Sequence, residues 1–282
     1  TRNELLRQIE RVGGYLSALR DHATEWNVSI GPLRDKQVSE GERDALRASY
    51  RLGAQATWAH ILADVDSVRA DRLNEVHEQF RDRQAVVIRG ASGQGKSTLA
   101  FRYMRDFAAD GLRFYVRFVE GRAHAIRIAH ALRNHIAALG LRAVVIVDLA
   151  PSDSGWMELV KDLTNVGINV LVTVREEDFH RAGVASRDVP LGEVALDSIT
   201  RQEAEDIFNS LVRLGAATPH LDFGEAWSRF TTGDAGPLLE FTHLVTEGET
   251  LTNKIEGQVA RLQQEALEPG RPITVRHLKL LA

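Results

Sequence analysis

The chain has 282 residues, of which 44% are hydrophobic and 26% are charged, a composition typical of a globular protein with a sizeable core. A net charge of −4 predicts no bulk attraction to nucleic acid or to an anionic membrane, so we expect no membrane partner and no direct binding of nucleic acid by this segment. The absence of cysteine excludes disulfides and cysteine-ligated zinc, and it fits a reducing compartment.

The ends of the chain carry no targeting signal. No apolar run approaches the ~20 residues that a membrane span needs, and no signal peptide is visible, so we expect a cytoplasmic protein. The chain begins at Thr1 and ends in residues that read as the middle of a helix. We therefore expect a piece of a longer protein.

The first 66 residues are predicted to be helical. Apolar residues recur at helical spacing between Leu5 and Leu16, and again between Leu46 and Leu62. Gly31-Pro32 marks a break between the two stretches. No catalytic constellation stands out in this segment, and a further short amphipathic helix follows from Arg69 to Phe80.

Strands and helices then alternate, which predicts βαβ units and a parallel sheet. The strands are predicted at 85–88, 114–119, 143–147 and 169–174, and the helices at 98–107, 125–139 and 156–166. The β signal fades after about residue 190, and helices are predicted at 200–215, 224–231, 237–247 and 251–266. The pattern divides the chain into a helical segment, an α/β core, a second helical segment and the start of a following domain, at 1–66, 67–190, 191–266 and 267–282.

A glycine-rich loop follows the first predicted strand directly. Gly90-Ala91-Ser92-Gly93-Gln94-Gly95-Lys96-Ser97 matches G-x-x-x-x-G-K-[ST], with a strand before it and a helix after it. Glycines let backbone N–H groups curl around a phosphate, and the helix directs its positive dipole end at the same place. We predict a P-loop that binds ATP with Mg²⁺; the alternative is a glycine-rich turn with a solvated lysine.

Each polar residue of the loop has a predicted role. Lys96 reaches the β- and γ-phosphates, the Ser97 hydroxyl is a Mg²⁺ ligand, and Thr98 adds a contact to the α-phosphate. The candidate nucleotide-binding residues of the loop are Gly90, Ser92, Gly93, Gln94, Gly95, Lys96, Ser97 and Thr98.

Asp148 ends an apolar strand and is predicted to hold Mg²⁺ through water beside the loop. The alternative is an ordinary aspartate in a turn. Leu149 stands where a second acid would activate water, which favours slow or conditional hydrolysis. The nearest acids for that task are Asp153, Glu120 and Glu176, and none is compelling.

Arg175 ends the next strand and could sense the γ-phosphate from the same sheet edge. The alternative is a surface arginine paired with Glu176 or Glu177. His124, His130 and His135 lie on one predicted helix, but their spacings of six and five make no i, i+4 ligand pair. Surface or packing roles are therefore favoured for these histidines.

The order of these motifs resembles the STAND class of signal-transducing ATPases, which includes NACHT and NB-ARC modules and bacterial antiviral defence members. Thr173-Val174-Arg175 is similar to the strand-ending T-T-R of that class, with valine in place of one threonine. Leu196–Phe208 is similar to its entry to a helical lid. Gly236-Pro237-Leu238-Leu239 resembles its G-x-P segment without the spacer, and Val68-Arg69 its V-G-R-E segment without the glycine.

The resemblance implies a P-loop NTPase fold of the ASCE or AAA+ kind, with a C-terminal helical lid and an N-terminal helical segment. It implies catalytic roles for Lys96, Asp148 and Arg175, a place for Arg69 near the base or ribose, and packing of Pro237 on the adenine. A proline at the start of a helix is the simpler account of Pro237. A winged-helix domain would begin near 272–278.

The resemblance also implies a switch. ADP would hold a closed monomer, and ATP would support a homo-oligomer that activates an effector, after a sensor domain detects a trigger such as a foreign protein. Three alternatives stay open: an AAA+-type motor or loader, a P-loop phosphotransferase, and a structural nucleotide-binding module without turnover. The long helical segment after residue 190 argues against the phosphotransferase.

Overall fold

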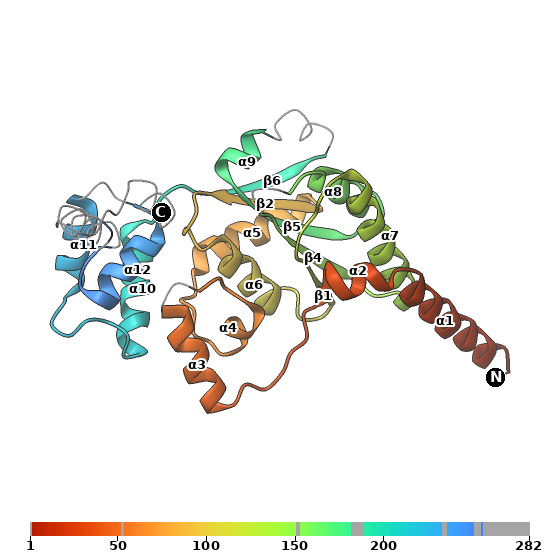
Figure 1. Ribbon diagram of the computed structural model, residues 1–282, viewed down its shortest axis with the longest axis horizontal. Coiled ribbons are helices and arrows are strands. Elements are labelled where there is room, and N and C mark those ends of the chain that lie inside the picture. Colours follow the sequence, from red (N-terminus) through yellow and green to blue (C-terminus); the bar gives the residue numbers. More distant parts are fainter. Residues whose placement is uncertain are drawn as a thin grey trace, which may run out of the picture. The chain divides into compact units, whose positions relative to one another are not determined.

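A computed structural model describes residues 2–51, 54–150, 153–181, 189–232, 236–250 and 255. It divides into two compact units, Thr1–Asp197 and Ser198–Ala282, which we call the sheet unit and the helical unit (Figure 1). The helix predicted at 251–266, apart from Ile255, and the domain predicted to start at 267 lie outside the described residues.

The sheet unit is built on six strands in the order β1-β3-β4-β5-β2-β6. Their bounds are β1 (Ile30–Pro32), β2 (Ala85–Gly90), β3 (Leu112–Val116), β4 (Ala143–Asp148), β5 (Asn169–Arg175) and β6 (Leu191–Leu196). Only β1 is antiparallel to its neighbour, and the other pairs are parallel. The predicted fold class, an α/β fold with a mostly parallel sheet, is confirmed, and the glycine-rich loop follows β2, which lies between β5 and β6.

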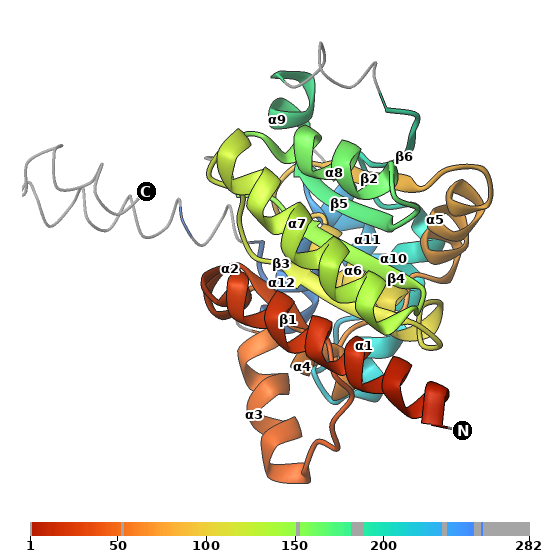
Figure 2. The same ribbon diagram turned by 90° about the vertical axis from the view of Figure 1, so that its right-hand side faces the viewer.

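Helices cover both faces of the sheet, which explains why its strands read as continuous apolar runs. Side chains alternate along β2, so that Val87 packs with one helix layer while Val86 and Ile88 pack with the other. The first layer contains α7 (Arg122–Leu139) and α8 (Trp156–Thr164), and the second contains α5 (Ala70–Asp82) and α6 (Lys96–Asp106). Figure 2 looks onto α7, in front of the sheet.

The N-terminal segment is mostly helical, as predicted, but it also supplies a strand. Its helices are α1 (Arg2–Asp21), α2 (Ala23–Val28), α3 (Glu40–Arg51) and α4 (Trp58–Leu62). The predicted break at Gly31-Pro32 is instead β1, which pairs with β3 from Ile30 to Pro32. A proline is tolerated on an edge strand, and three residues are too few for a periodic signal. This segment belongs to the same compact unit as the sheet, so the division into two units has no boundary at residue 66.

The predicted loss of β structure after residue 190 is wrong for residues 191–196. They form β6, which pairs in parallel with β2 along its whole length. Only one face of β6 is buried, and Gly192 and Glu193 interrupt its apolar pattern, so its propensity is weak. A side chain at residue 192 would meet Gln79 of α5, which accounts for the glycine. The sheet unit therefore includes β6 and ends at Asp197.

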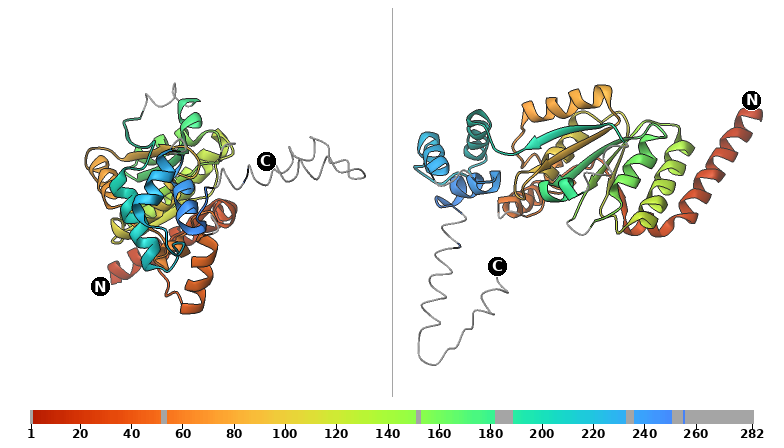
Figure 3. Two further views of the ribbon diagram at one scale, coloured as in Figure 1. Left: turned by 90° about the vertical axis from the view of Figure 1, so that its left-hand side faces the viewer. Right: turned by 90° about the horizontal axis from the view of Figure 1, so that it is seen from above.

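The helical unit contains three described helices around their own core (Figure 3). They are α10 (Arg201–Arg213), α11 (Phe223–Thr232) and α12 (Leu238–Glu247), close to the predicted ranges. Thr200 begins α10 with a capping box, in which its side chain accepts from the Glu203 amide and the Glu203 carboxylate accepts from the Thr200 amide. None of the helices in the described part of the chain is both long enough and apolar enough to cross a bilayer.

Candidate functional site

The glycines of the loop hold backbone conformations that other residues resist. Gly90 has φ of 152°, Gly93 of 78° and Gly95 of 75°. At Gly90 a Cβ would also lie 2.5 Å from the carbonyl oxygen of Leu196, which is backbone and cannot swing away. Gly95, in the left-handed region, turns the chain into α6. The loop therefore presents its amides at the start of an 11-residue helix, an arrangement suited to an anion.

Lys96 lies across this loop. Its Nζ donates to the carbonyl oxygens of Gly90, at 2.9 Å, and Ala91, at 2.7 Å. Burial lowers the pKa of Lys96, and the positive charge of Arg175 lowers it further. A phosphate in the loop would favour the charged form of Lys96 and so oppose this lowering of its pKa.

Asp148 is oriented by two hydroxyl groups. Ser97 Oγ donates to Asp148 Oδ1 at 3.0 Å, and Thr173 Oγ1 donates to the same oxygen from the neighbouring strand. Asp148 Oδ2 is buried and has no hydrogen-bond partner among the described residues. A carboxylate oxygen left free beside a serine hydroxyl matches the oxygen ligands that Mg²⁺ prefers, so the predicted pair fits that ion.

Thr173 was not identified from the sequence as a partner of Asp148. Parallel pairing places Thr173 directly opposite Asp148, and its side chain is only 1% exposed. The available signal was a single hydroxyl within the otherwise apolar run of β5. A buried hydroxyl needs a hydrogen-bond partner, and the strand register supplies this one.

Arg175 lies opposite Gly90 in the β2–β5 register, at the edge of the sheet where the loop begins. It makes no ion pair with any residue in the described ranges. Glu176 pairs instead with Arg89, at 2.5 Å, and with His180, at 2.9 Å. The structure thus brings Arg175 to the loop and assigns Glu176 to other partners.

The three acids considered for activating water have other contacts. Asp153 Oδ2 accepts from the Ala150 amide at 2.8 Å, and Glu120 is exposed. Glu176 is held by Arg89, and within the described part of the chain none of the three hydrogen-bonds to Lys96, Ser97 or Asp148. None of these three acids is therefore held in place to activate water beside Lys96, Ser97 and Asp148.

Gln94 and Arg69 tie the loop to its surroundings. Arg69, which precedes α5, donates from Nη1 to the Gln94 carbonyl oxygen at 3.0 Å and is 8% exposed. The Gln94 side chain is buried and donates from Nε2 to the Asp197 carbonyl oxygen at 3.1 Å. Arg69 is thus brought to the loop, whereas Pro237 precedes α12 in the helical unit, where its role stays a prediction.

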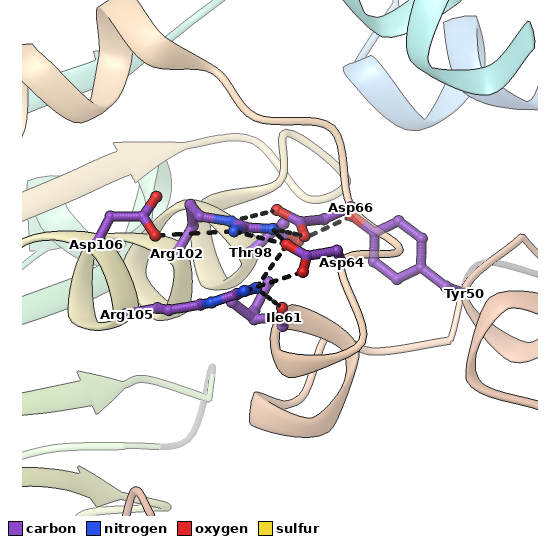
Figure 4. A network of polar contacts seen from close by, with 8 residues as sticks. All are labelled: Tyr50, Ile61, Asp64, Asp66, Thr98, Arg102, Arg105 and Asp106. Atoms are coloured by element: carbon purple, nitrogen blue, oxygen red, sulfur yellow. Dashed lines mark hydrogen bonds and ion pairs between the residues drawn. The ribbon is translucent and has the colours of Figure 1, made fainter. Parts of the chain in front are cut away.

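An ion-pair network anchors the helix of the loop to the N-terminal segment (Figure 4). Arg102 of α6 is buried and donates from Nε to Asp66 Oδ2 at 3.0 Å and from Nη1 to Asp64 Oδ1 at 3.1 Å. Arg105, one turn away, donates to Asp64 Oδ2 at 2.9 Å. No local pattern in the sequence indicates this network, because the fold alone brings the paired residues together.

The three histidines have the surface or packing roles that the sequence favoured: His124 and His135 are buried, and His130 is exposed. His124 shares a hydrogen bond of 2.9 Å with Ser29 Oγ, and the His135 ring lies 4.5 Å from that of Trp26. Among the described residues no group of three or more His, Cys, Asp or Glu side chains could hold a metal ion.

Comparisons with known proteins add little to this geometry. No family model matches the chain, and no curated protein matches it in sequence. Among solved structures, the Orc1 protein of Aeropyrum pernix in complex with DNA matches at 16% identity and a TM-score of 0.44. The match covers 72% of this chain and 64% of the Orc1 chain, so the chain spans less than two thirds of that protein.

Proposed function

We propose that the chain binds ATP with Mg²⁺ at Gly90–Thr98 and acts as the nucleotide-dependent switch of a STAND-type signalling or defence protein. One observation carries the proposal: Ser97 and Asp148, 51 residues apart in sequence, meet at 3.0 Å beside the loop. A glycine-rich turn with a solvated lysine would not require this pair, whereas an ATP site with its metal does.

Different groups of the loop bind different parts of the triphosphate. The amides and the helix N-terminus hold the β-phosphate, and Lys96 neutralises the β- and γ-phosphates after exchanging its bonds to the Gly90 and Ala91 carbonyls. Ser97 and Asp148 would hold Mg²⁺ at the sheet edge, and the ion would supply positive charge to neutralise the phosphates.

Arg175 supplies the nucleotide sensing that a switch requires. Its position opposite Gly90 in the strand register supports this role, because the cation lies at the sheet edge where the loop begins. A γ-phosphate adds charge that Arg175 can meet, and its loss on hydrolysis removes that partner. Arg175, at the end of β5, would therefore distinguish ATP from ADP.

Turnover by this site is slow or conditional. Leu149 follows Asp148, and Glu176 is engaged with Arg89. The same observation favours a second candidate, a module that binds nucleotide without hydrolysing it. A phosphate-release assay separates the two: slow release that Lys96→Ala abolishes supports the switch, and retained nucleotide with no release supports the binding module.

Substitution of Lys96 tests the site itself. We expect Lys96→Ala to lose ATP binding in calorimetry while keeping the circular dichroism spectrum of the wild type, because the loop amides alone cannot neutralise the phosphates. Lys36→Ala, which removes an exposed lysine paired with Glu42, is the control and should bind normally. Undiminished ATP affinity in Lys96→Ala would contradict the assignment.

Native mass spectrometry of the full-length protein tests the switch. We expect bound ADP in the monomer, and a homo-oligomer when ATP is present together with the trigger that the sensor domain detects. A protein that stays monomeric with both ligands would contradict oligomerisation and the activation of an effector, while leaving nucleotide binding intact.

A further inference from the structure

Two neighbouring hydroxyl groups in the first turn of α6 face different sides of the loop. Ser97 Oγ donates to Asp148, whereas Thr98 Oγ1 lies 3.3 Å from the hydroxyl oxygen of Tyr50. Successive residues of a helix point about 100° apart, so the two contacts mark two distinct sides. One side belongs to the strands, and the other belongs to the N-terminal segment.

The strand side is the γ-phosphate end of the site. Lys96, Asp148 and Arg175 gather there, and the metal pair is formed there. A triphosphate is a linear group with the nucleoside at its far end. With its γ-phosphate at the strand side, the nucleotide would direct its nucleoside toward Thr98, where Tyr50 lies.

Tyr50 has the chemistry and the fixed position of a contact residue. Its ring is 5.5 Å from that of His60, and His60 is buried and hydrogen-bonded to Ser49 Oγ at 3.0 Å. Burial raises the pKa of Tyr50 to about 12, so its hydroxyl stays neutral at physiological pH. The side chain is thus an aromatic face already held beside the loop.

The network of Figure 4 fixes this side of the site. Arg102, one turn after Thr98, is bound to Asp64 and Asp66, so the segment before Arg69 cannot move away from α6 without exposing buried charges. Arg69 completes the same side through its bond to the Gln94 carbonyl. The N-terminal segment is therefore held in a fixed position beside Thr98.

We propose that the ring of Tyr50 contacts the ribose and base of the nucleotide, making Tyr50 a specificity residue at the nucleoside end of the site. This inference rests on the proposed binding of ATP at the loop. It assigns to α3, which carried no functional signal in the sequence, a direct part in recognising the ligand.

A comparison of two ligands distinguishes a contact between Tyr50 and the nucleoside from a purely structural role of Tyr50. Calorimetry with the complete chain would compare MgATP and magnesium tripolyphosphate, which has the phosphates without the nucleoside. We expect Tyr50→Ala to weaken MgATP binding about ten-fold, as loss of base–aromatic stacking does, and to leave tripolyphosphate binding unchanged. Tyr50→Phe keeps the ring and should keep most of the MgATP affinity.

Tyr115→Phe, on β3, is the matched control for loss of a phenol hydroxyl and should bind both ligands as the wild type does. Equal weakening of both ligands in Tyr50→Ala would show that Tyr50 only supports Thr98, and it would overturn the inference. Unchanged MgATP affinity in that variant would overturn it as well.

A photolabelling experiment on the unaltered chain covers the case in which Tyr50→Ala does not fold. An azido-adenine analogue of ATP should label the peptide that contains Tyr50, and excess ATP should prevent the labelling. Labelling of other peptides alone overturns the inference. A wild-type chain that binds neither MgATP nor tripolyphosphate overturns the proposed function itself, whereas normal binding without any effect of Tyr50 overturns only this inference.

Discussion

At the scale of single residues, the site depends on groups whose orientation is set by their neighbours. Asp148 is the clearest case, because one of its oxygens accepts from both Ser97 and Thr173 while the other has no partner among the described residues. A carboxylate held in this way keeps its free oxygen aimed in one direction. Groups that orient metal ligands commonly matter nearly as much as the ligands themselves.

Thr173→Val tests this orientation. We expect Mg²⁺-dependent ATP binding to weaken about ten-fold, because the carboxylate of Asp148 loses one of its two fixed donors. Binding of ATP in the presence of a chelator should change little. Thr164→Val, which removes a hydroxyl bonded to a helix carbonyl in α8, is the control. An unchanged Mg²⁺ requirement in Thr173→Val would show that Ser97 alone orients Asp148.

At the scale of secondary-structure elements, the loop is held by a close approach of β2 to β6. Gly90 has a positive φ and lies against the Leu196 carbonyl. We expect Gly90→Ala to lower the free energy of unfolding by about 1–3 kcal/mol from backbone strain, and by more from the contact with Leu196. Urea unfolding measures the change.

Gly167→Ala is the comparison for that experiment. Gly167 also has a positive φ, of 80°, but a Cβ there would meet nothing within 4 Å. It should therefore show the conformational cost without the clash. Equal losses in both variants would mean that β6 moves aside at little cost.

Helix α6 is fixed by two arginines that differ in burial. The side chains of Arg102 and Asp66 are 6% and 1% exposed, whereas those of Arg105 and Asp64 are 30% and 58% exposed. We expect Arg102→Met to cost about 3–5 kcal/mol, because it leaves Asp66 buried without its partner. Arg105→Met should cost less than about 1 kcal/mol.

Urea unfolding of both variants measures the difference, and similar losses would contradict the importance of burial. The double variant Arg102→Met with Asp66→Leu provides a further check. It removes the buried charge together with its partner, and it should recover part of the stability lost in Arg102→Met alone.

The sequence predicted the repeating elements of this fold better than its connections. Apolar runs and the loop motif identified β2, β4 and β5, because buried parallel strands carry continuous apolar side chains. It missed β1 and β6, which are edge strands with weak patterns. Of the site, Lys96, Ser97 and Asp148 were predicted from spacing. Thr173 was not, because its role depends on a strand register that no local pattern encodes.

At the scale of the whole molecule, buried tyrosines make stability depend on alkaline pH. The pKa of Tyr103 is raised to about 12 by burial, and the pKa of Tyr115 is raised to about 12 by burial and then by the charge of Asp148. An unfolded tyrosine ionises near pH 10. Stability from these groups is therefore complete below about pH 10 and is lost as the pH rises toward 12.

Absorbance of tyrosinate during an alkaline titration checks this dependence. Tyr50, Tyr103 and Tyr115 should ionise only when the protein unfolds, and in urea all four tyrosines of the chain should ionise near pH 10. A folded protein with four tyrosines ionised near pH 10 would contradict the burial of these hydroxyl groups.

The first residue and the middle of the glycine-rich loop contact the last two residues of the sheet unit. Gly90 fits against the Leu196 carbonyl, and the Gln94 amide group is bonded to the Asp197 carbonyl. A ligand that reshapes the loop at either point must displace the end of β6 or break one of these contacts. If a ligand displaces residue 197, thermodynamic reciprocity requires that a displacement of residue 197 changes the affinity of the loop for that ligand, with an equal coupling free energy.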